Sequence, residues 1–390
     1  MTSGNAPQGV SMGHHAIYLD SNATTPTEPA VLDEVMHYLA VEYGNAGSRT
    51  HEYGQTAKSR VQRAREQVAA VVEAQPDEVI FTSGATESNN VALLGLAPHG
   101  EKTGRRRIVT TQIEHKAVLE PIDELRKRGF DVVYVPPTSG GWVDPEAIAA
   151  ALTPDTLAVS VMHVNNETGV RQPLGDIVNE LRDHDAYLHV DAAQGFGKEL
   201  PDLRDPRIDL ISVSGHKIFG PMGVGALITR RRGYKRPPLT PLTFGGGQEH
   251  GLRAGTLPVP LVAGLGVAAQ LARDNHSRRR DACLAYRQDV ITTFQQLDAE
   301  FNGDLERTVA HTINVSIPGL DSEAVMLALK GAAAISNGSA CTSHSYTPSH
   351  VLTAMNLPPG RIQGALRISW SHLTPTTNWE DLRERIAAIR

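Results

Sequence analysis

Short apolar runs alternate with amphipathic segments along most of this 390-residue chain. The apolar runs are predicted strands, at residues 79–83, 107–112, 131–136, 157–164, 186–191 and 209–214. Segments between them, such as 115–129 and 173–185, repeat apolar residues with the period of a helix. This alternation predicts an α/β fold with a largely parallel sheet covered on both faces. Functional sites in such folds collect at the carboxyl ends of the strands.

The pattern changes near residue 258, where a predominantly helical region, 258–300, begins. Shorter strands are expected at 311–317 and 365–370, followed by a terminal helix from about Asn378. We therefore expect a large domain at 31–265 and a smaller α/β domain formed by 18–30 and 266–390. Residues 1–17 are expected to be a disordered leader or a tag.

Composition excludes several classes of function. A net charge of −6 gives no general reason for direct nucleic-acid binding. Three arginine triplets (105–107, 230–232 and 278–280) are the exception, and they are predicted to lie on a solvated surface or in a docking patch. No run of about 18 apolar residues or secretory signal is present, so no membrane span is expected. Two cysteines give no disulfide framework, which fits the reducing cytoplasm. No metal site is predicted.

Two residues at predicted strand ends point to a pyridoxal 5′-phosphate site. Asp191 ends one apolar strand, and Lys217 follows another, just before a Gly-rich turn. A lysine can bind this cofactor as a Schiff base, while an aspartate keeps the pyridine nitrogen protonated. Either residue alone is weak evidence, because a strand-end aspartate is commonly a cap and a lysine is commonly solvated. Their joint placement favours the cofactor site.

The stretch TSGATESNN (82–90) can hold the cofactor phosphate, because a Gly turn there runs into a helix. The candidate hydrogen-bond donors to the phosphate in this stretch are Gly84, Ala85 and Thr86. Ser214 and His216, which precede Lys217, are further candidate donors. An ordinary capped helix would explain the same residues at 82–90.

His115 and the pair Asn165–Asn166 follow two other predicted strands. The histidine could stack on a pyridoxal ring and exchange protons near neutral pH. The asparagines could face a substrate or the ring hydroxyl. A helix cap for His115 and a turn for the asparagines are the structural alternatives.

From about Tyr18 to its C-terminus the chain resembles the cysteine desulfurases, pyridoxal phosphate enzymes of the type I aminotransferase fold. The matching stretches occur in the family's order: YLDSNATTP, GNAGSRTHEYG, FTSGATESNN, TQIEHKAV, MHVNNETGVRQP, HVDAAQGFGK, SGHKIFGPMGVG, GGGQEHGLRAGTLPV, SNGSACTS and ALRIS. The resemblance is to the first group of these enzymes, which includes the nitrogenase-type and iron–sulfur-cluster members. It implies a homodimer and a mostly parallel, seven-stranded sheet.

The resemblance also implies roles for single residues. Lys217 would form the Schiff base, Asp191 would pair with the pyridine nitrogen, and Gln194 would donate to the ring hydroxyl. Arg367 would grip the carboxylate of L-cysteine, which Asn166 would also face. Thr256 would reach the phosphate of the partner subunit, alongside Thr86, Ser214 and His216, and His115 would stack on the ring.

Cys341 matches the family's nucleophile, which receives sulfur as a persulfide. Its neighbours in SNGSACTSHSYTPSH (336–350) are small and polar, which predicts a mobile loop at about 336–346 that carries sulfur to an acceptor protein. Cys283 lies in a helical pattern and is expected to be structural.

The acceptor and the pathway stay open. The loop also resembles that of the desulfurase of the bacterial DNA phosphorothioation system, and iron–sulfur cluster assembly and tRNA thiolation are the alternatives. The cluster-assembly members commonly continue ALRIS with Gly-Arg, where this chain has WSH (370–372). A selenocysteine lyase, an aminotransferase and an inactive scaffold are the remaining alternatives. A loop thiol would be of no use to an aminotransferase.

Overall fold

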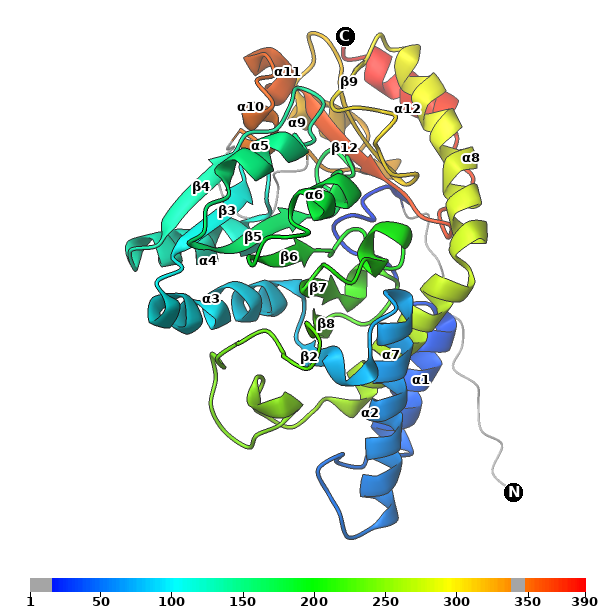
Figure 1. Ribbon diagram of the computed structural model, residues 1–390. Coiled ribbons are helices and arrows are strands. Elements are labelled where there is room, and N and C mark those ends of the chain that lie inside the picture. Colours follow the sequence, from blue (N-terminus) through cyan, green and yellow to red (C-terminus); the bar gives the residue numbers. More distant parts are fainter. Residues whose placement is uncertain (1–15, 338–347) are drawn as a thin grey trace, which may run out of the picture.

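The computed structural model describes residues 16–337 and 348–390, and a large β-sheet forms its centre (Figure 1). Within this part of the chain the sheet has seven strands. In spatial order they are β2 (Val79–Thr82), β8 (Gly225–Thr229), β7 (Leu210–Ser214), β6 (Tyr187–Asp191), β5 (Thr156–Met162), β3 (Arg107–Thr111) and β4 (Asp131–Val135). Only β8 runs against its neighbours, so the sheet is mostly parallel, as predicted.

The register of the sheet brings several strand ends to one edge. Asp191, at the end of β6, pairs with Met162, the last residue of β5, and with Ser212 in β7. Because β2 and β7 are both antiparallel to β8, they run in the same direction. The carboxyl ends of β2, β7, β6, β5 and β3 therefore lie at the same edge.

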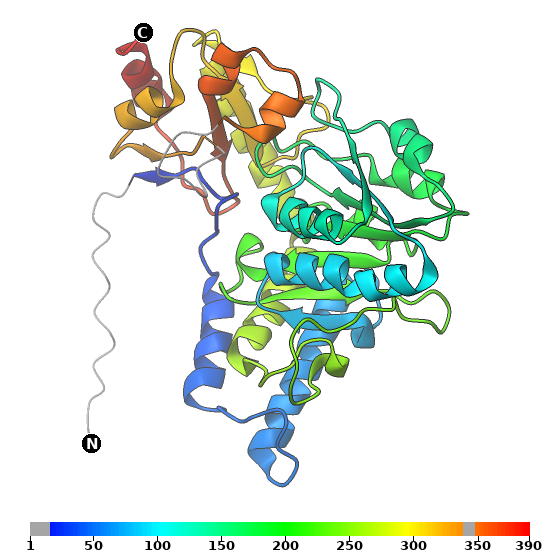
Figure 2. The same ribbon diagram turned by 90° about the vertical axis from the view of Figure 1, so that its left-hand side faces the viewer.

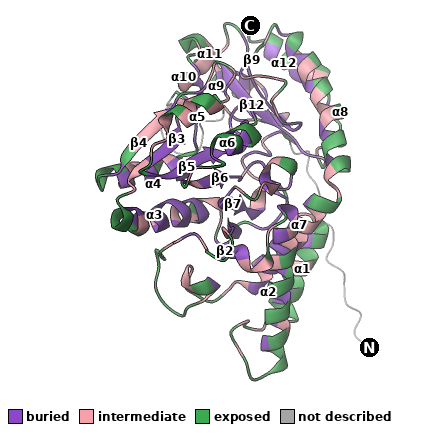
Figure 3. Ribbon diagram, in the orientation of Figure 1, coloured by how far each residue is buried: buried purple, intermediate pink, exposed green. Residues whose placement is uncertain are grey.

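Helices cover both faces of the main sheet (Figure 2). Successive strand residues enter opposite cores: Ile108 packs with α3 (Ala85–Thr103) and α4 (Lys116–Lys127), whereas Val109 packs with the opposite layer. That layer contains α2 (Glu52–Val71), α5 (Pro145–Ala151), α6 (Leu174–Glu180) and α7 (Val259–Asp274). Strands buried on both faces explain the nearly continuous apolar runs in the sequence. Figure 3 shows most of these strands as buried, except the edge strand β4, while the outer face of α2 is largely exposed.

A separate hydrophobic core joins the C-terminal elements to the N-terminal segment. It contains Leu19, Cys283 of α8 (His276–Gln295), Phe294, Val315 and Trp370. Its sheets comprise β9 (Glu300–Phe301), β10 (Thr312–Ser316) and β12 (Ala365–Ser369), with β1 (Ile17–Tyr18) pairing with β11 (Ala333–Ala334). The other helices are α1 (Pro29–Ala40), α9 (Ser322–Ala328), α10 (His350–Ala354), α11 (Pro359–Gln363) and α12 (Trp379–Ala387). The separation of this core from the two cores of the main sheet supports the two-domain division, which we retain as a proposal.

The arginine triplets are only partly on the surface: Arg278 and Arg280 are exposed, as predicted, whereas Arg230 and Arg279 are buried, which corrects the prediction for those two residues. Arg230 is 5 % exposed, and its guanidinium donates to the carbonyl oxygens of Val72, Leu203 and Asp205. The other two triplets also enter internal pairs, such as Arg107 with Asp131 and Arg279 with Glu28. Periodicity misses such contacts because the carbonyl acceptors come from distant loops.

Among the described helices, none combines the length and apolar character needed to cross a bilayer. Across residues 16–337 and 348–390 the structure also gathers no cluster of three side chains suited to hold a metal ion.

Candidate active site

A cavity of about 460 Å³ opens where β5, β6 and β7 end. Met162, Asp191 and Ser214, the last residues of these strands, all line it. It also receives most of the residues predicted from the sequence: Gly84, Ala85, Thr86, His115, Asn166, Gln194, His216, Lys217 and Arg367. The sheet edge thus gathers side chains that are far apart along the chain.

Asp191 is fixed by two hydrogen bonds at the end of β6. Its Oδ2 accepts from Nδ2 of Asn89 at 2.8 Å, and its Oδ1 accepts from the backbone N–H of Ala193 at 3.0 Å. Asp191 is 5 % exposed and Asn89 is fully buried. The carboxylate is thereby held in one orientation toward the cavity, which suits an interaction with a ring N–H.

Lys217 lies in the short 3₁₀ turn Gly215–Lys217, directly after β7. Its Nζ donates to the carbonyl oxygens of Asn22 and Ala23, the latter at 2.7 Å. Gln194 donates from Nε2 to the same Asn22 carbonyl at 2.9 Å. The N-terminal segment therefore forms a wall of the cavity and holds the lysine amine there.

The N-terminus of α3 forms another wall. Gly84 precedes the helix with a φ of +153°, a conformation that glycine adopts far more readily than other residues. No side chain of the described residues caps this helix, so backbone N–H groups of its first turn are available to an anion. Ser214 and His216 line the same cavity. Burial lowers the pKa of His216 to about 4, with smaller contributions from the Lys217 and Lys198 ammonium groups, so its imidazole is neutral at pH 7.

His115 is both a helix cap and a cavity residue, so the two predictions for it are compatible. Its Nδ1 accepts from the N–H of Ala117 at 3.1 Å, at the start of α4. Desolvation lowers the pKa of His115 and the Lys217 charge lowers it further, although Asp191 opposes both effects. The imidazole is therefore neutral at pH 7, and because its Nδ1 accepts a hydrogen bond, its proton lies on Nε2.

Glu114, the residue before His115, is fully buried. Burial raises its pKa to about 8, against hydrogen bonds from Thr111 Oγ1 at 2.7 Å and the Met162 N–H at 2.9 Å. The carboxyl is therefore protonated at neutral pH and links the end of β3 to the end of β5.

Arg367 reaches the cavity from β12, in the smaller core. Its Nη2 lies 2.6 Å from Oδ1 of Asp20, and its Nη1 donates to the carbonyl oxygen of Asn166 at 3.1 Å. The side chain is 3 % exposed, and its Nε has no hydrogen-bond partner among the described residues. A guanidinium with an unused donor at a cavity wall can bind a carboxylate.

Asn165 does not fit the predicted ligand role, because its side chain is used within its own turn. It is fully buried, its Nδ2 donates to the Ile113 carbonyl at 3.1 Å, and its Oδ1 accepts from the N–H groups of Glu167 and Thr168. Thr256 is exposed and does not line this cavity. Cys341 lies outside the described residues, together with 1–15 and the rest of 338–347.

Asn22 and Asn89 are site residues for which the sequence predicted no role. Asn22 contacts Lys217 and Gln194 through its carbonyl, and its Oδ1 accepts from Thr312 at 3.0 Å. Asn89 lies one helical turn after Thr86, on the same face of α3. That spacing could have identified Asn89 as a site residue from the sequence. Asn22 could not be identified in this way, because it acts through its backbone carbonyl.

Comparison with known proteins places this site in a family. The sequence model of the aminotransferase class V family matches residues 17–382, so the chain belongs to this pyridoxal phosphate-dependent family. Within it, the chain is a cysteine desulfurase. It is 44% identical over 362 residues to the cysteine desulfurase of Pongo abelii, covering 92% of this chain and 78% of the relative.

Two further relatives extend the comparison. The cysteine desulfurase IscS of Vibrio cholerae is 42% identical over 361 residues, covering 92% of this chain and 88% of that protein. The crystal structure of DndA from Streptomyces lividans is 52% identical, with a TM-score of 0.80, covering 91% of this chain and 99% of that one. The chain is thus similar to both across nearly its whole length.

The residues of the cavity fit pyridoxal phosphate. Three buried polar atoms at its wall have no partner within the described ranges: Oδ1 of Asn89, Oε1 of Gln194 and Nε of Arg367. With the uncapped start of α3, the lysine and the buried aspartate, they offer contacts to an anion, a polar ring and a carboxylate.

Proposed function

We propose that this protein converts L-cysteine to L-alanine and transfers the substrate sulfur to Cys341 as a persulfide. The transfer balances, because one thiol and cysteine become one persulfide and alanine. The observation that carries the proposal is the convergence of Lys217, Asp191 and Arg367, from three distant parts of the chain, on one cavity.

Pyridoxal phosphate would be held by groups at the cavity wall. Lys217 would bind it covalently, Asp191 would face its ring nitrogen, and Gln194 its ring hydroxyl, while His115 would lie against the ring. The phosphate would be held by residues 84–86, Ser214 and His216. When bound, the cofactor supplies a ring that accepts the electron pair left on the substrate's α-carbon.

The chain's own residues would orient the substrate and move its protons. Arg367 would bind the substrate carboxylate with Asn166 beside it, and the salt bridge to Asp20 keeps the guanidinium aimed at the cavity. The Lys217 amine would remove the α-proton. His115 or the positive charges of the site would assist deprotonation of Cys341 to the thiolate, which is the attacking form of a thiol.

A homodimer is the proposed assembly, and an exposed apolar face supports it. Leu32, Met36 and Leu39 repeat at helical spacing on α1 and are 50%, 52% and 55% exposed. Tyr43 and Tyr53, which stack with their ring centroids 5.6 Å apart, extend this face and are also exposed. Apolar surface of this kind is typical of a subunit interface. Exposed Thr256 would complete the partner's phosphate site.

The proposed destination of the sulfur is a protein of DNA phosphorothioate modification in the cytoplasm. The sequence of the Cys341 loop motivates this choice. The chain's higher identity to DndA, 52%, than to IscS, 42%, supports a grouping away from the cluster-assembly members. The net charge of −6 favours a partner protein, rather than this chain, as the one that meets DNA.

The activity is tested by incubating the holoenzyme with L-cysteine and a thiol reductant and measuring alanine and sulfide. We expect equal amounts of both, and no alanine from Lys217→Ala. Transfer of the amino group to a keto acid without sulfide release would indicate an aminotransferase. Persulfide transfer is then assayed with purified acceptors from DNA modification, cluster assembly and tRNA thiolation, and preference for either of the last two would contradict the proposed pathway.

A further inference from the structure

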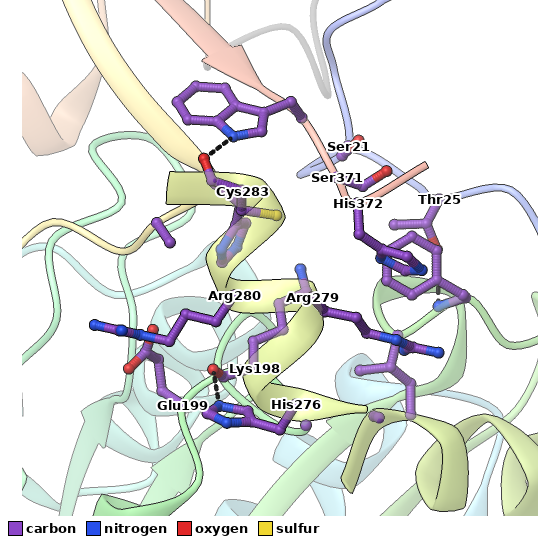
Figure 4. Close-up of a pocket in the computed structure, with 17 residues that line it drawn as sticks. Ser21, Thr25, Lys198, Glu199, His276, Arg279, Arg280, Cys283, Ser371 and His372 are labelled. Carbon is purple, nitrogen blue, oxygen red and sulfur yellow. Dashed lines mark hydrogen bonds between the residues drawn. The ribbon is translucent and has the colours of Figure 1, made fainter. Parts of the chain in front are cut away.

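A second, smaller cavity lies behind the N-terminal wall of the active site (Figure 4). Ser21 and Thr25 line this cavity, whereas residues 22–24, between them, line the active-site cavity. The same division occurs after Lys217, because Lys217 lines the active-site cavity, whereas the next two residues, Ile218 and Phe219, line the second cavity. One layer of chain therefore separates the two spaces.

Basic side chains surround this second cavity. Lys198, Arg279 and Arg280 line it, together with His311, whose imidazole is neutral because burial lowers its pKa well below 6.5. Figure 4 shows the Lys198 side chain extending toward Cys283 on α8. The carboxylate that also lines it, Glu199, lies 3.4 Å from Arg171. Arg279 is paired with Glu28 at 2.7 Å, and burial lowers the pKa of Lys198 to about 7. The positive charge of the cavity therefore comes from Arg280 and from Lys198 in its protonated form.

Two buried nitrogen atoms at this cavity are unused. Nε2 of His311 and Nε of Arg279 have no hydrogen-bond partner in the described part of the chain, and these residues are 6% and 9% exposed. Buried polar groups in folded proteins are nearly always paired. Two such groups at one small positive cavity therefore indicate a missing ligand with negative charge.

The dimensions and lining restrict what that ligand can be. The cavity has a volume of about 50 Å³, room for roughly three to five water molecules. Phe219, Ala272, Ala310 and Trp370 give it apolar walls, which cannot replace the water shell of a multiply charged ion. A phosphate ester or an amino acid is too large. A small anion with a single charge satisfies both limits.

We propose that this second cavity binds a small monovalent anion, such as chloride, bromide or nitrate, through Lys198, Arg279 and His311. The segment WSH (370–372) forms part of its wall, so the departure from the Gly-Arg pair common in the cluster-assembly members lies at this site. The charges of Lys198 and Lys217 repel each other, and a bound anion would offset that repulsion. A bound anion would therefore change the electrostatic environment of Lys217 in the active site without contacting the active-site residues.

The test uses the holoenzyme and sodium bromide, with sodium gluconate keeping the ionic strength constant. Binding to the folded state alone raises the melting temperature in a saturable way. We expect this rise for the wild type and for Lys102→Met, an exposed lysine on α3, and we expect its loss in Lys198→Met. A bromide response that is the same in all three proteins would overturn the proposal.

Diffraction at the bromide absorption edge keeps the proposal testable if Lys198→Met does not fold. Crystals of the wild type soaked in bromide should show an anomalous peak between Lys198, Arg279 and His311. Bromide found only on the outer surface would overturn the assignment.

Discussion

Asn89 donates a 2.8 Å hydrogen bond from Nδ2 to the Oδ2 atom of Asp191, across 102 residues of sequence. A hydrogen bond to a charged group contributes about 1.5–3 kcal/mol, more than a neutral pair. We expect Asn89→Ala to lower kcat for alanine formation roughly 10- to 100-fold, because 1.4 kcal/mol corresponds to tenfold in rate. Steady-state kinetics with L-cysteine measures this, and the KM should change little.

Asn90→Ala is the matched control for this prediction, since Asn90 is only half-buried and its Nδ2 donates to the Thr86 carbonyl of its own helix. It should leave kcat within about twofold of the wild type, as expected for a surface change. Equal losses in the two variants would mean that the effect comes from α3 as a whole.

Glu114 makes the stability of the folded protein decrease as the pH rises. Its pKa rises from an ordinary value of 4.5 to about 8 on folding, mainly through burial. Between these values the unfolded state loses a proton that the folded state keeps. The contribution of Glu114 to stability is therefore complete below pH 4.5 and is lost as the pH rises to 8, by at most about 1.4 kcal/mol per pH unit.

Glu114→Gln removes this titration but keeps an oxygen that can accept from Thr111 and Met162. We expect its free energy of unfolding, relative to the wild type, to increase from pH 5 to pH 8 in urea titrations. A difference that stays constant across this range would show that Glu114 ionises normally in the folded protein.

Replacement of Arg367 should act on substrate binding. Lysine keeps the charge but loses the forked geometry that matches a carboxylate. We expect Arg367→Lys to raise the KM for L-cysteine roughly 10- to 100-fold, from the loss of about 1.5–3 kcal/mol of charge-assisted hydrogen bonding. Arg385→Lys, at an exposed ion pair on α12, is the control and should leave the KM unchanged. An unchanged KM in both variants would remove Arg367 from the substrate site.

The apolar face of α1 predicts the assembly state. Met36→Asp places a charge at the centre of this face, and burying an unpaired charge in an interface is strongly unfavourable. Analytical ultracentrifugation should show a dimer for the wild type and mostly monomer for Met36→Asp. Leu327→Asp, at a residue 70% exposed on α9, should remain a dimer. A dimer in all three proteins would place the interface elsewhere.

The sequence predicted the main sheet well, because strands buried on both faces appear as continuous apolar runs. The exception is β8, whose residues GALIT follow a Gly-rich turn and were not identified as a separate strand. Side chains at or shortly after strand ends, such as Asp191 and His115, were also predictable, since strand ends of a parallel sheet converge.

Contacts made by backbone atoms were beyond the reach of the sequence. Asn22 holds Lys217 through a carbonyl oxygen that every residue has, so its identity gave no signal. Arg230 is a similar case, because its acceptors are backbone carbonyl groups of two separate segments, at Val72 and at Leu203 and Asp205. The second cavity depends on how α8 packs against the N-terminal segment, and no local motif encodes that packing.

The central claim is that the sulfur of L-cysteine is transferred to Cys341. The most direct measurement is mass spectrometry of the holoenzyme after it reacts with L-cysteine without a reductant, followed by peptide mapping under conditions that preserve persulfides. The account predicts a gain of one sulfur atom on the peptide that contains Cys341, and no gain in Cys341→Ser. Sulfur found on Cys283, or alanine formed by Cys341→Ser at the wild-type rate, would contradict it.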